Sequence, residues 1–291
     1  MVRRSPTGRG VAVKLVVTGA GGGLGQAFLE QLPSHHDVVP LSHGELDVGD
    51  YHRVMQTIVP LAPDAVLNFA AMTRVDACES EPEAAYRANT TEPHNLALAA
   101  RQAGSMLLHV STDYVFDGEK GSAYDELDAV NPLSTYARSK LGGETAVRTV
   151  HPEHLIVRTS YVFGSGTDYA SVAVERLARK ETAGGLTDRI GSPTFVRHLA
   201  ARILPLLLTA RFGTYHVCGA EPASWFDVLA HAKSIGNLPG ELTEQTSEEL
   251  ALPARRPRNS SMVSLFTKDL GLEPMLPLEV AVKEWIDGRG H

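Results

Sequence analysis

Short apolar runs rich in β-branched residues alternate along this chain with longer segments of helical periodicity. The runs are VAVKLVVT, DVVPLS, AVLNFAA, MLLHVST and HLIVRTS, and helical patterns such as GLGQAFLEQL and YARSKLGGETAV stand between them. This alternation is typical of βαβ units, whose strands are parallel. Because the runs are continuously apolar rather than alternating, helices should cover both faces of the sheet. The sequence therefore predicts an α/β fold with a doubly wound parallel sheet.

The regular alternation weakens after Gly164. We expect residues 14–164 to form the sheet domain and residues 165–291 to form mainly a smaller lobe, with segments near 195–218 returning to the sheet domain. Residues 1–13 begin with the basic sequence MVRRSPTGRG and are expected to be a disordered tail. The apolar run that follows is too short for a secretory signal and lacks a small-residue cleavage site.

The composition excludes several kinds of partner. With 43% hydrophobic and 21% charged residues the chain is typical of a globular protein, and its net charge of -7 comes without a basic cluster that would attract nucleic acid. No run approaches the roughly 20 apolar residues of a membrane span. Cys78 and Cys218 are far apart, which suits a reducing compartment, and the histidines show no metal-ligand spacing. We therefore predict a cytoplasmic protein without a structural disulfide or a bound metal.

Five glycines fall within seven positions in the stretch GAGGGLGQ, directly after the first apolar run. In a parallel sheet, the turn from the first strand into the first helix directs backbone N–H groups and the helix N-terminus toward a bound pyrophosphate. The spacing GxGxxG does not fit here, whereas GxxGxxG fits at Gly19, Gly22 and Gly25. Such a loop can also be a plain tight turn. Its place after the first strand favours a dinucleotide-binding loop, which would include Gly23 and Leu24.

The end of the second run bears on the choice between NADH and NADPH. An acid at this point would bind the ribose 2′-hydroxyl and repel a 2′-phosphate. The sequence PLSHGELDV instead places Ser42 and His43 at the tip, and the first acid is Glu45. A neutral or cationic tip tolerates NADPH, and NADH is also possible; His43 can equally be an ordinary loop histidine.

Tyr136 and Lys140 form a YxxxK pattern at the start of a predicted helix, and Ser111, Thr112 and Asp113 end the preceding run. Residues four apart share a helix face, so the phenol and the ammonium can point into one cleft. A nearby ammonium would lower the tyrosine pKa from its usual value of roughly 10 and so aid proton exchange. Thr112 could hold a substrate carbonyl oxygen against the tyrosine. The YxxxK pattern also occurs on solvated helices, but its position one helix after STD favours catalysis.

The motifs NFAAMTRVDACE, RANTTEPHNLA, STDYVFDG, YARSK, RTSYVFG, IGSPT and RRPRNSS follow the glycine loop in this order. In these motifs the chain resembles the dTDP-4-dehydrorhamnose reductases, which are extended short-chain dehydrogenase/reductases. The resemblance implies a Rossmann fold with a small C-terminal substrate-binding domain. It also implies NAD(P)H-dependent reduction of the C4 ketone of a dTDP-4-keto-6-deoxy-hexose, and it allows a homodimer.

The resemblance further implies roles for single residues. The catalytic residues would be Thr112, Tyr136 and Lys140. The residues that hold the cofactor or shape its cleft would be Gly19, Gly22, Gly23, Leu24, Gly25, His43, Asp47, Val48, Ala70, Ala71, Asn89, Tyr136 and Lys140. The substrate-binding residues would be Thr73, Asp113, Tyr114, Val115, Tyr161, Pro193 and Arg256.

Several of these assignments have a structural alternative. Asn89 could satisfy backbone groups inside a helix, and Arg256 could be a surface cation. Asp47 could cap the helix that follows it. Many members of the family carry Trp after RTS, whereas this chain has Tyr161, so its preference for sugar or base can differ.

Other functions of the same fold stay open at this point. A 4,6-dehydratase needs a carboxylate directly after the Thr-Asp pair, and this chain has Tyr114 there, which disfavours that activity. A nucleotide-sugar epimerase is an alternative because the sequence does not reveal cofactor exchange. A non-catalytic NADP-binding regulatory subunit is another, and the presence of both Tyr136 and Lys140 speaks against it.

Overall fold

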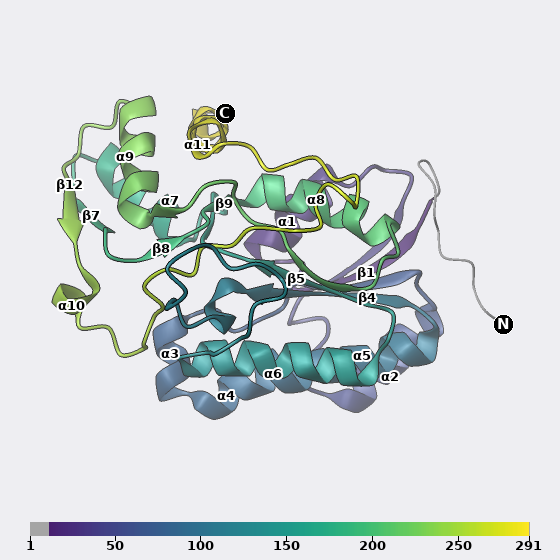
Figure 1. The fold of residues 1–291 in the computed structure, drawn as a ribbon. Helices are drawn as coiled ribbons and strands as arrows, with labels where there is room; N and C mark the ends of the chain where they lie inside the picture. The colour runs from purple at the N-terminus through teal and green to yellow at the C-terminus, as the bar shows by residue number, and fades with distance from the viewer. Residues whose placement is uncertain (1–11, 291) are drawn as a thin grey trace.

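A six-stranded parallel sheet forms the centre of the protein (Figure 1). The computed structural model describes residues 12–290, so the predicted tail lies almost wholly outside the described residues. The strands, in spatial order, are β10 (Gly213–His216), β5 (His154–Thr159), β4 (Met106–Thr112), β3 (Ala65–Asn68), β1 (Lys14–Thr18) and β2 (Asp37–Leu41). Every neighbouring pair is parallel, which confirms the predicted sheet.

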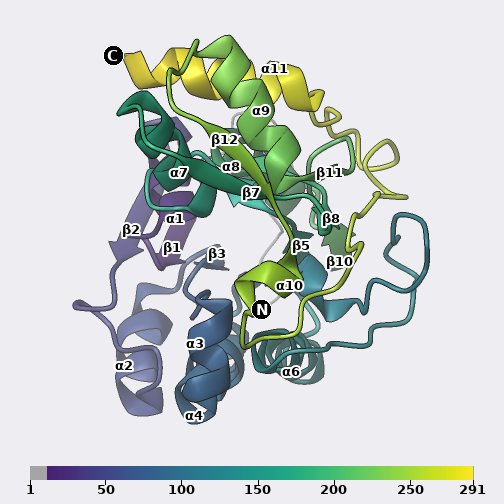
Figure 2. The same cartoon turned by 90° about the vertical axis from the view of Figure 1, so that its left-hand side faces the viewer.

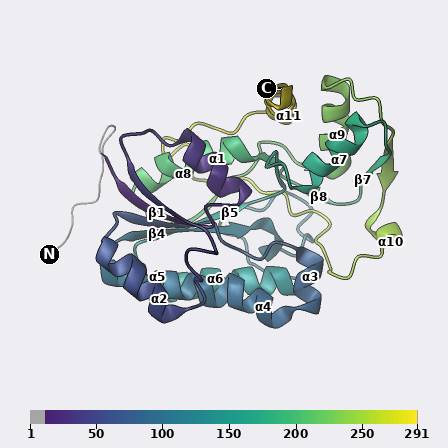
Figure 3. The same cartoon turned by 180° about the vertical axis from the view of Figure 1, so that it is seen from behind.

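Helices cover both faces of this sheet (Figures 1 and 3). One face carries α1 (Gly23–Gln31) and α8 (Val196–Leu208), and the other carries α2 (Tyr51–Leu61), α5 (Glu92–Ala103) and α6 (Thr135–Val150), with α3 (Val75–Ser80) and α4 (Pro82–Tyr86) beside α6. Successive residues of one strand enter the two opposite cores. Leu15 is buried in the core that contains Phe28 of α1, and Val16 is buried in the core that contains Ile58 of α2. The continuous apolar runs therefore have the double burial that was expected of them.

The order of the strands reverses between β1 and β3, because β1 pairs with β2 on one side and with β3 on the other. In open α/β sheets the crevice outside the carboxyl ends of such strands is where ligands bind. The ends of β1 and β3 are tied together by Thr18, whose Oγ1 donates to Oδ1 of Asn68 at 2.9 Å. The glycine loop after β1 and the segment after β3 are thereby fixed at this crevice.

A smaller lobe stands at the carboxyl end of the sheet (Figure 2). Its elements are α7 (Tyr169–Ala178), β7 (Ala183–Leu186), α9 (Trp225–Ile235), β12 (Leu242–Gln245) and α10 (Ser247–Leu250), and α11 (Leu278–Asp287) packs against α9. β7 and β12 form a parallel pair, and three of the strands around the junction between the lobes are β6 (Val162–Phe163), β8 (Ile190–Gly191) and β9 (Thr194–Phe195). α8 and β10, which lie between the elements of this lobe in sequence, belong to the sheet domain.

Candidate active site

The glycine loop leaves β1 and enters α1 through a turn that requires glycine at two positions. Gly19 has a φ of 71°, and a Cβ at Gly19 would lie 2.5 Å from the backbone nitrogen of Ala70. A Cβ at Gly25 would lie 2.4 Å from the carbonyl oxygen of Gly19. These two glycines let α1 and the segment after β3 approach the loop closely, as a phosphate-binding turn requires.

The N-terminus of α1 has the features of an anion site. Its N-cap is Gly22, which has no side chain to accept from the first backbone N–H groups of the helix. A Cβ at Gly21 would meet no atom within 4 Å, so the space in front of the loop is open. The side chain of Leu24 packs into the core and leaves its backbone on the loop side. The loop therefore fits the pyrophosphate of a dinucleotide, which the helix N-terminus would attract.

After β2, the carboxylate of Glu45 lies closer to Ser42 and His43 than the sequence suggested. Glu45 accepts hydrogen bonds from the backbone N–H of Ser42 at 2.7 Å and from its Oγ at 2.6 Å. These hydrogen bonds lower the pKa of Glu45, so the group is ionised near neutral pH. His43 is exposed between the two. The tip therefore carries one negative charge beside an exposed histidine.

Asp47 and Val48, the next predicted cofactor residues, are held by neighbouring segments. Oδ1 of Asp47 accepts from the backbone N–H of Gly49 at 2.9 Å, and its Oδ2 forms an ion pair with Arg87 at 2.7 Å. The N-cap of α2 is Asp50, so the alternative role of Asp47 as a cap is wrong. Val48 is buried, and its carbonyl oxygen accepts from the side chain of Asn95.

Asn89 is buried and links two segments of the sheet domain. It is fully buried within a π-helix (Arg87–Thr91). Its amide exchanges two 3.0 Å hydrogen bonds with the backbone of Met72 and donates a third to Oγ of Ser139 on α6. The polar atoms of its side chain are thus used to join the segment after β3 to α6. Ala70 and Ala71 remain at the partly exposed edge of that segment.

Tyr136, Lys140 and Thr112 come together where β4 ends beside α6. α6 begins after Ser134, whose Oγ accepts from the backbone N–H of Ala137 as an N-cap. Tyr136 and Lys140 lie on the buried face of α6, one turn apart, and Thr112 is the last residue of β4. The Thr112 hydroxyl is within hydrogen-bonding reach of the Tyr136 hydroxyl. The structure therefore brings the three predicted catalytic side chains to one place.

The protonation of this group differs from what the sequence suggested. Burial raises the pKa of Tyr136 well above its ordinary value. The expected lowering by Lys140 is wrong for this structure, because desolvation dominates and Nζ of Lys140 donates to the carbonyl oxygen of Val110 at 2.7 Å. Burial lowers the pKa of Lys140 to about 8, against the raising effect of Glu144. At neutral pH the site therefore holds a protonated phenol and a mostly charged lysine.

Two predicted substrate residues next to Thr112 face inward. Val115 is fully buried in a small core with Phe116, so its side chain does not reach a substrate. Asp113 is 2% exposed and accepts from three hydroxyl groups. Pro193 is also buried, and its carbonyl oxygen packs against Gly219, where a Cβ would lie 1.9 Å away. Thr73, in contrast, is exposed in the segment after β3.

Aromatic rings connect the catalytic group to the smaller lobe. The Tyr114 ring lies edge to face against Tyr136 with the centroids 6.1 Å apart. Tyr161 is hydrogen-bonded to Tyr114 and stacks on Trp225 of α9 at 4.8 Å with the rings nearly parallel. Tyr161 has a φ of 45°, so its backbone is strained at this junction. The tyrosine that replaces the usual tryptophan thus joins the two lobes through a ring stack and a hydrogen bond.

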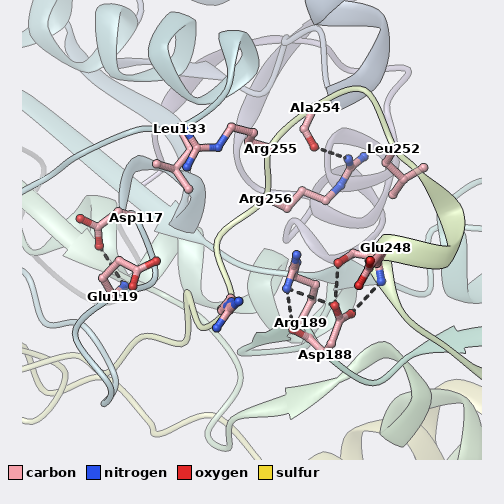
Figure 4. Close-up of a pocket in the computed structure, with 12 residues that line it drawn as sticks. Asp117, Glu119, Leu133, Asp188, Arg189, Glu248, Leu252, Ala254, Arg255 and Arg256 are labelled. Carbon is pink, nitrogen blue, oxygen red and sulfur yellow. Dashed lines mark hydrogen bonds and ion pairs between the residues drawn. The ribbon is translucent and has the colours of Figure 1, made fainter.

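A cavity of about 930 Å³ is lined by side chains from the segment after β4, from the turn before β8 and from the segment around Arg256 (Figure 4). The cavity is lined by Asp117, Glu119, Leu133, Asp188, Arg189, Ser247, Glu248, Leu252, Ala254, Arg255, Arg256 and Arg258. The charges of Arg189 and Arg256 act on Tyr114. Nε of Arg189 is buried without a hydrogen-bond partner among the described residues. The arginines therefore provide donors for an anionic ligand in this cavity.

The comparisons with known proteins agree with this geometry. Residues 13–289 match the protein-family profile described as the RmlD substrate binding domain. The chain is 33% identical over 278 residues to a dTDP-4-dehydrorhamnose reductase of Aggregatibacter actinomycetemcomitans, covering 90% of this chain and 94% of that protein. The chain belongs to the dTDP-4-dehydrorhamnose reductase family.

Solved structures of this family have the same fold. A dTDP-4-dehydrorhamnose reductase of Clostridium acetobutylicum is 32% identical with a TM-score of 0.92, covering 96% of this chain and all of that one. The enzyme of Bacillus anthracis, crystallised in complex with NADP, is 31% identical with the same TM-score and coverage. The predicted family, Rossmann-type fold and enzyme class are confirmed.

Sequence reasoning missed Asp76 and Arg189. Asp76 forms a bidentate ion pair with Arg256, which stands 180 residues later, and no local pattern reveals that pairing. Arg189 directly precedes the IGSPT motif, and this position was the available signal.

No helix within residues 12–290 is long and apolar enough to cross a membrane. The same part of the chain contains no group of three or more His, Cys, Asp or Glu side chains suited to a metal ion.

Proposed function

We propose that this protein uses NADPH to reduce the C4 ketone of dTDP-4-dehydro-L-rhamnose to dTDP-L-rhamnose in nucleotide-sugar biosynthesis. The observation that carries the proposal is the meeting of Thr112, Tyr136 and Lys140 where β4 ends beside α6, in a chain of the reductase family. The NADP complex of the Bacillus anthracis relative supports the choice of cofactor. NADH remains a possible second cofactor.

Tyr136 is the proton donor in this proposal. Because burial keeps its phenol protonated at neutral pH, it can protonate the ketone oxygen as negative charge develops there. A bound nicotinamide would supply the hydride to the ketone carbon. Lys140 has one ammonium proton committed to Val110 and two available for the ribose hydroxyls of the cofactor.

The cavity wall suits the nucleoside diphosphate end of the substrate. Arg255 and Arg258 have no ion pair with any described residue, and Arg189 has a buried nitrogen without a partner. Guanidinium groups with free donors bind diphosphate oxygens well. The sugar would then lie toward Tyr114, on which the charges of Arg189 and Arg256 act, and toward Tyr136 beside it.

The test is turnover of dTDP-4-dehydro-L-rhamnose with NADPH, followed by the loss of reduced cofactor and by NMR of the product. Stoichiometric dTDP-L-rhamnose is expected. Tight NADPH binding without reduction of any dTDP-4-keto sugar would favour the regulatory-subunit alternative, and conversion of dTDP-glucose to its 4-keto-6-deoxy derivative would favour a dehydratase.

Location and assembly are further proposals. We infer a cytoplasmic location, supported by two buried cysteines that are both free thiols. Cell fractionation tests this. A homodimer stays a prediction, and sedimentation equilibrium of the purified protein will decide it.

A further inference from the structure

Asp113 is a buried carboxylate with no cation beside it. It directly follows β4 and is 2% exposed. Oδ1 accepts from Oγ1 of Thr112 at 3.0 Å, and Oδ2 accepts from Oγ of Ser160 at 2.8 Å and from Oγ of Ser260 at 2.5 Å. Three hydroxyl groups stabilise this charge. Asp113 forms no ion pair with any residue from 12 to 290. The proposed reaction gives it no role so far.

The three hydroxyl groups come from separate parts of the chain. Thr112 ends β4, Ser160 follows β5, and Ser260 lies in the C-terminal segment that returns to the sheet domain. Oγ of Ser160 also accepts from the backbone N–H of Ser192, next to β8. One carboxylate therefore fixes the catalytic strand end relative to both segments that lead into the smaller lobe.

The direction of the hydrogen bond from Thr112 is the decisive detail. A threonine hydroxyl has a single proton, and here it is donated to Asp113. Oγ1 also accepts from the backbone N–H of Tyr114 at 3.2 Å, and Thr112 interacts with the Tyr136 side chain. With Asp113 ionised, Thr112 is thus an acceptor toward Tyr136 and has no proton for a ketone oxygen.

We propose that Asp113 is a positioning residue for the reductase reaction: it fixes the Thr112 hydroxyl as an acceptor that holds the Tyr136 phenol in place until the substrate binds. The single phenol proton then leaves Thr112 and passes to the ketone oxygen, so that Tyr136 alone protonates the ketone. This inference rests on the proposed function. It also changes the expected role of Thr112, which would bind the phenol rather than the carbonyl oxygen. A protonated Asp113 would become a donor, and one of its three hydroxyl partners would have to turn round to accept.

The surroundings of Asp113 give this arrangement a pH dependence. The titratable groups that face it are Tyr136 from α6, Tyr114 after β4, Tyr161 after β5 and Cys218 after β10, and all are neutral near pH 7. Burial raises the pKa of Asp113 to about 6, against the lowering effect of its three hydroxyl partners. We therefore expect kcat to fall below about pH 6, where the carboxylate takes up a proton.

A double-mutant cycle distinguishes positioning through Thr112 from a purely structural role. Asp113→Asn should lower kcat about 10- to 100-fold, the size of effect expected from a misplaced catalytic group. In the Thr112→Val background the same change should alter kcat less than about twofold, because the hydroxyl that Asp113 orients is already gone. The dissociation constant of NADPH, measured by fluorescence for each variant, should stay within about twofold of the wild type and show that the fold persists.

A second pair of variants keeps the inference testable if Asp113→Asn does not fold. Ser260→Ala removes a hydrogen bond that stabilises the Asp113 carboxylate. The decline of kcat at low pH should therefore begin at a higher pH in this variant. Ser261→Ala is the matched control, because its Oγ donates to Asn259 and not to Asp113. Ser261→Ala should leave the low-pH decline of kcat at the same pH as in the wild type.

The outcomes separate this inference from the proposed function. A wild-type protein that reduces no dTDP-4-keto sugar would remove the proposed function and this inference with it. If the wild type is active, two results would overturn the positioning role alone. One is that Ser260→Ala leaves the low-pH decline of kcat at the same pH as in the wild type. The other is that the effects of Asp113→Asn and Thr112→Val on kcat multiply independently.

Discussion

Arg256 and Asp76 form a bidentate ion pair that fastens the C-terminal segment to α3. Nη1 of Arg256 donates to Oδ1 of Asp76 at 3.0 Å, and Nη2 donates to Oδ2 at 2.7 Å. The backbone N–H of Ala254 donates to the same Oδ1 at 3.1 Å, and the Ala254 carbonyl accepts from Nη1 of Arg256 (Figure 4). Arg256 therefore stands in the cavity wall in a fixed orientation.

This pair predicts a specific defect for Asp76→Asn. The amide cannot form the charged bidentate pair, so the Arg256 guanidinium loses its orientation toward the diphosphate. We expect the KM for the dTDP-sugar to rise about tenfold, which corresponds to ~1.4 kcal/mol, while the NADPH dissociation constant stays unchanged. Asp287→Asn, which breaks the exposed pair with Lys283, is the control and should change neither value. A rise in KM of equal size in both variants would contradict the role of the pair.

The charge on Lys140 should govern cofactor binding. Because burial lowers the pKa of Lys140 to about 8, the ammonium is charged below this pH and neutral above it. NADPH binding should therefore weaken as the pH rises through 8. Fluorescence titration of NADPH between neutral pH and pH 9.5 or so checks this, and Lys140→Met should bind weakly and without the pH dependence. A wild-type titration that is flat across this range would refute the assignment.

The tip of β2 should set the preference for the adenosine ribose. We expect NADPH to bind at least as well as NADH. Glu45→Gln removes the carboxylate held by Ser42 and should shift the preference further toward NADPH by about fivefold, since two charges roughly 4 Å apart in water interact by ~1 kcal/mol. His43→Asp should shift it toward NADH, because a carboxylate repels the 2′-phosphate.

Dissociation constants for both cofactors, measured at one salt concentration, test this prediction. Glu284→Gln on α11 removes the same charge outside the glycine-loop site and should leave the ratio of the two constants unchanged. Wild-type protein that binds only NADH would show that the reasoning from the β2 tip is wrong.

The buried pair of Glu144 and Arg158 should be a major element of stability. Glu144 is fully buried on α6 and accepts Nε and Nη2 of Arg158 at 2.9 and 2.8 Å. Glu144→Gln leaves Arg158 without its counter-charge, which typically costs about 3–5 kcal/mol. Urea unfolding measures this, and the double variant Glu144→Leu/Arg158→Met should recover most of the loss. A Glu144→Gln protein as stable as the wild type would contradict the account.

The sheet and the glycine loop were predictable from the sequence because their signals are local. The runs around Leu15 and Val16 are apolar at every position, and Gly19 and Gly25 stand where β1 turns into α1. The YxxxK spacing likewise placed Tyr136 and Lys140 on one face of α6. Such patterns span a few residues, and the fold preserves them.

The roles of single polar residues were harder to predict because they depend on distant segments. Asn89 forms hydrogen bonds with Met72, 17 residues away, and with Ser139, 50 residues away, so it links distant segments. Asp113 is buried by Ser260, 147 residues later. The pKa of Tyr136 rises because of desolvation, which no helix spacing expresses. The YxxxK motif therefore predicts where the site lies, whereas the role of each polar residue in it depends on tertiary packing.

The replacement of Tyr136 by Phe tests the central claim most directly. It removes one oxygen and keeps the ring against Tyr114, so the fold and the NADPH site should persist. Loss of a general acid typically lowers the rate 10²- to 10⁴-fold, or about 3–5 kcal/mol of barrier. We predict that kcat for dTDP-4-dehydro-L-rhamnose falls by this factor while the NADPH dissociation constant stays within about twofold of the wild type. Full reductase activity in Tyr136→Phe would contradict the assignment of Tyr136 as the proton donor.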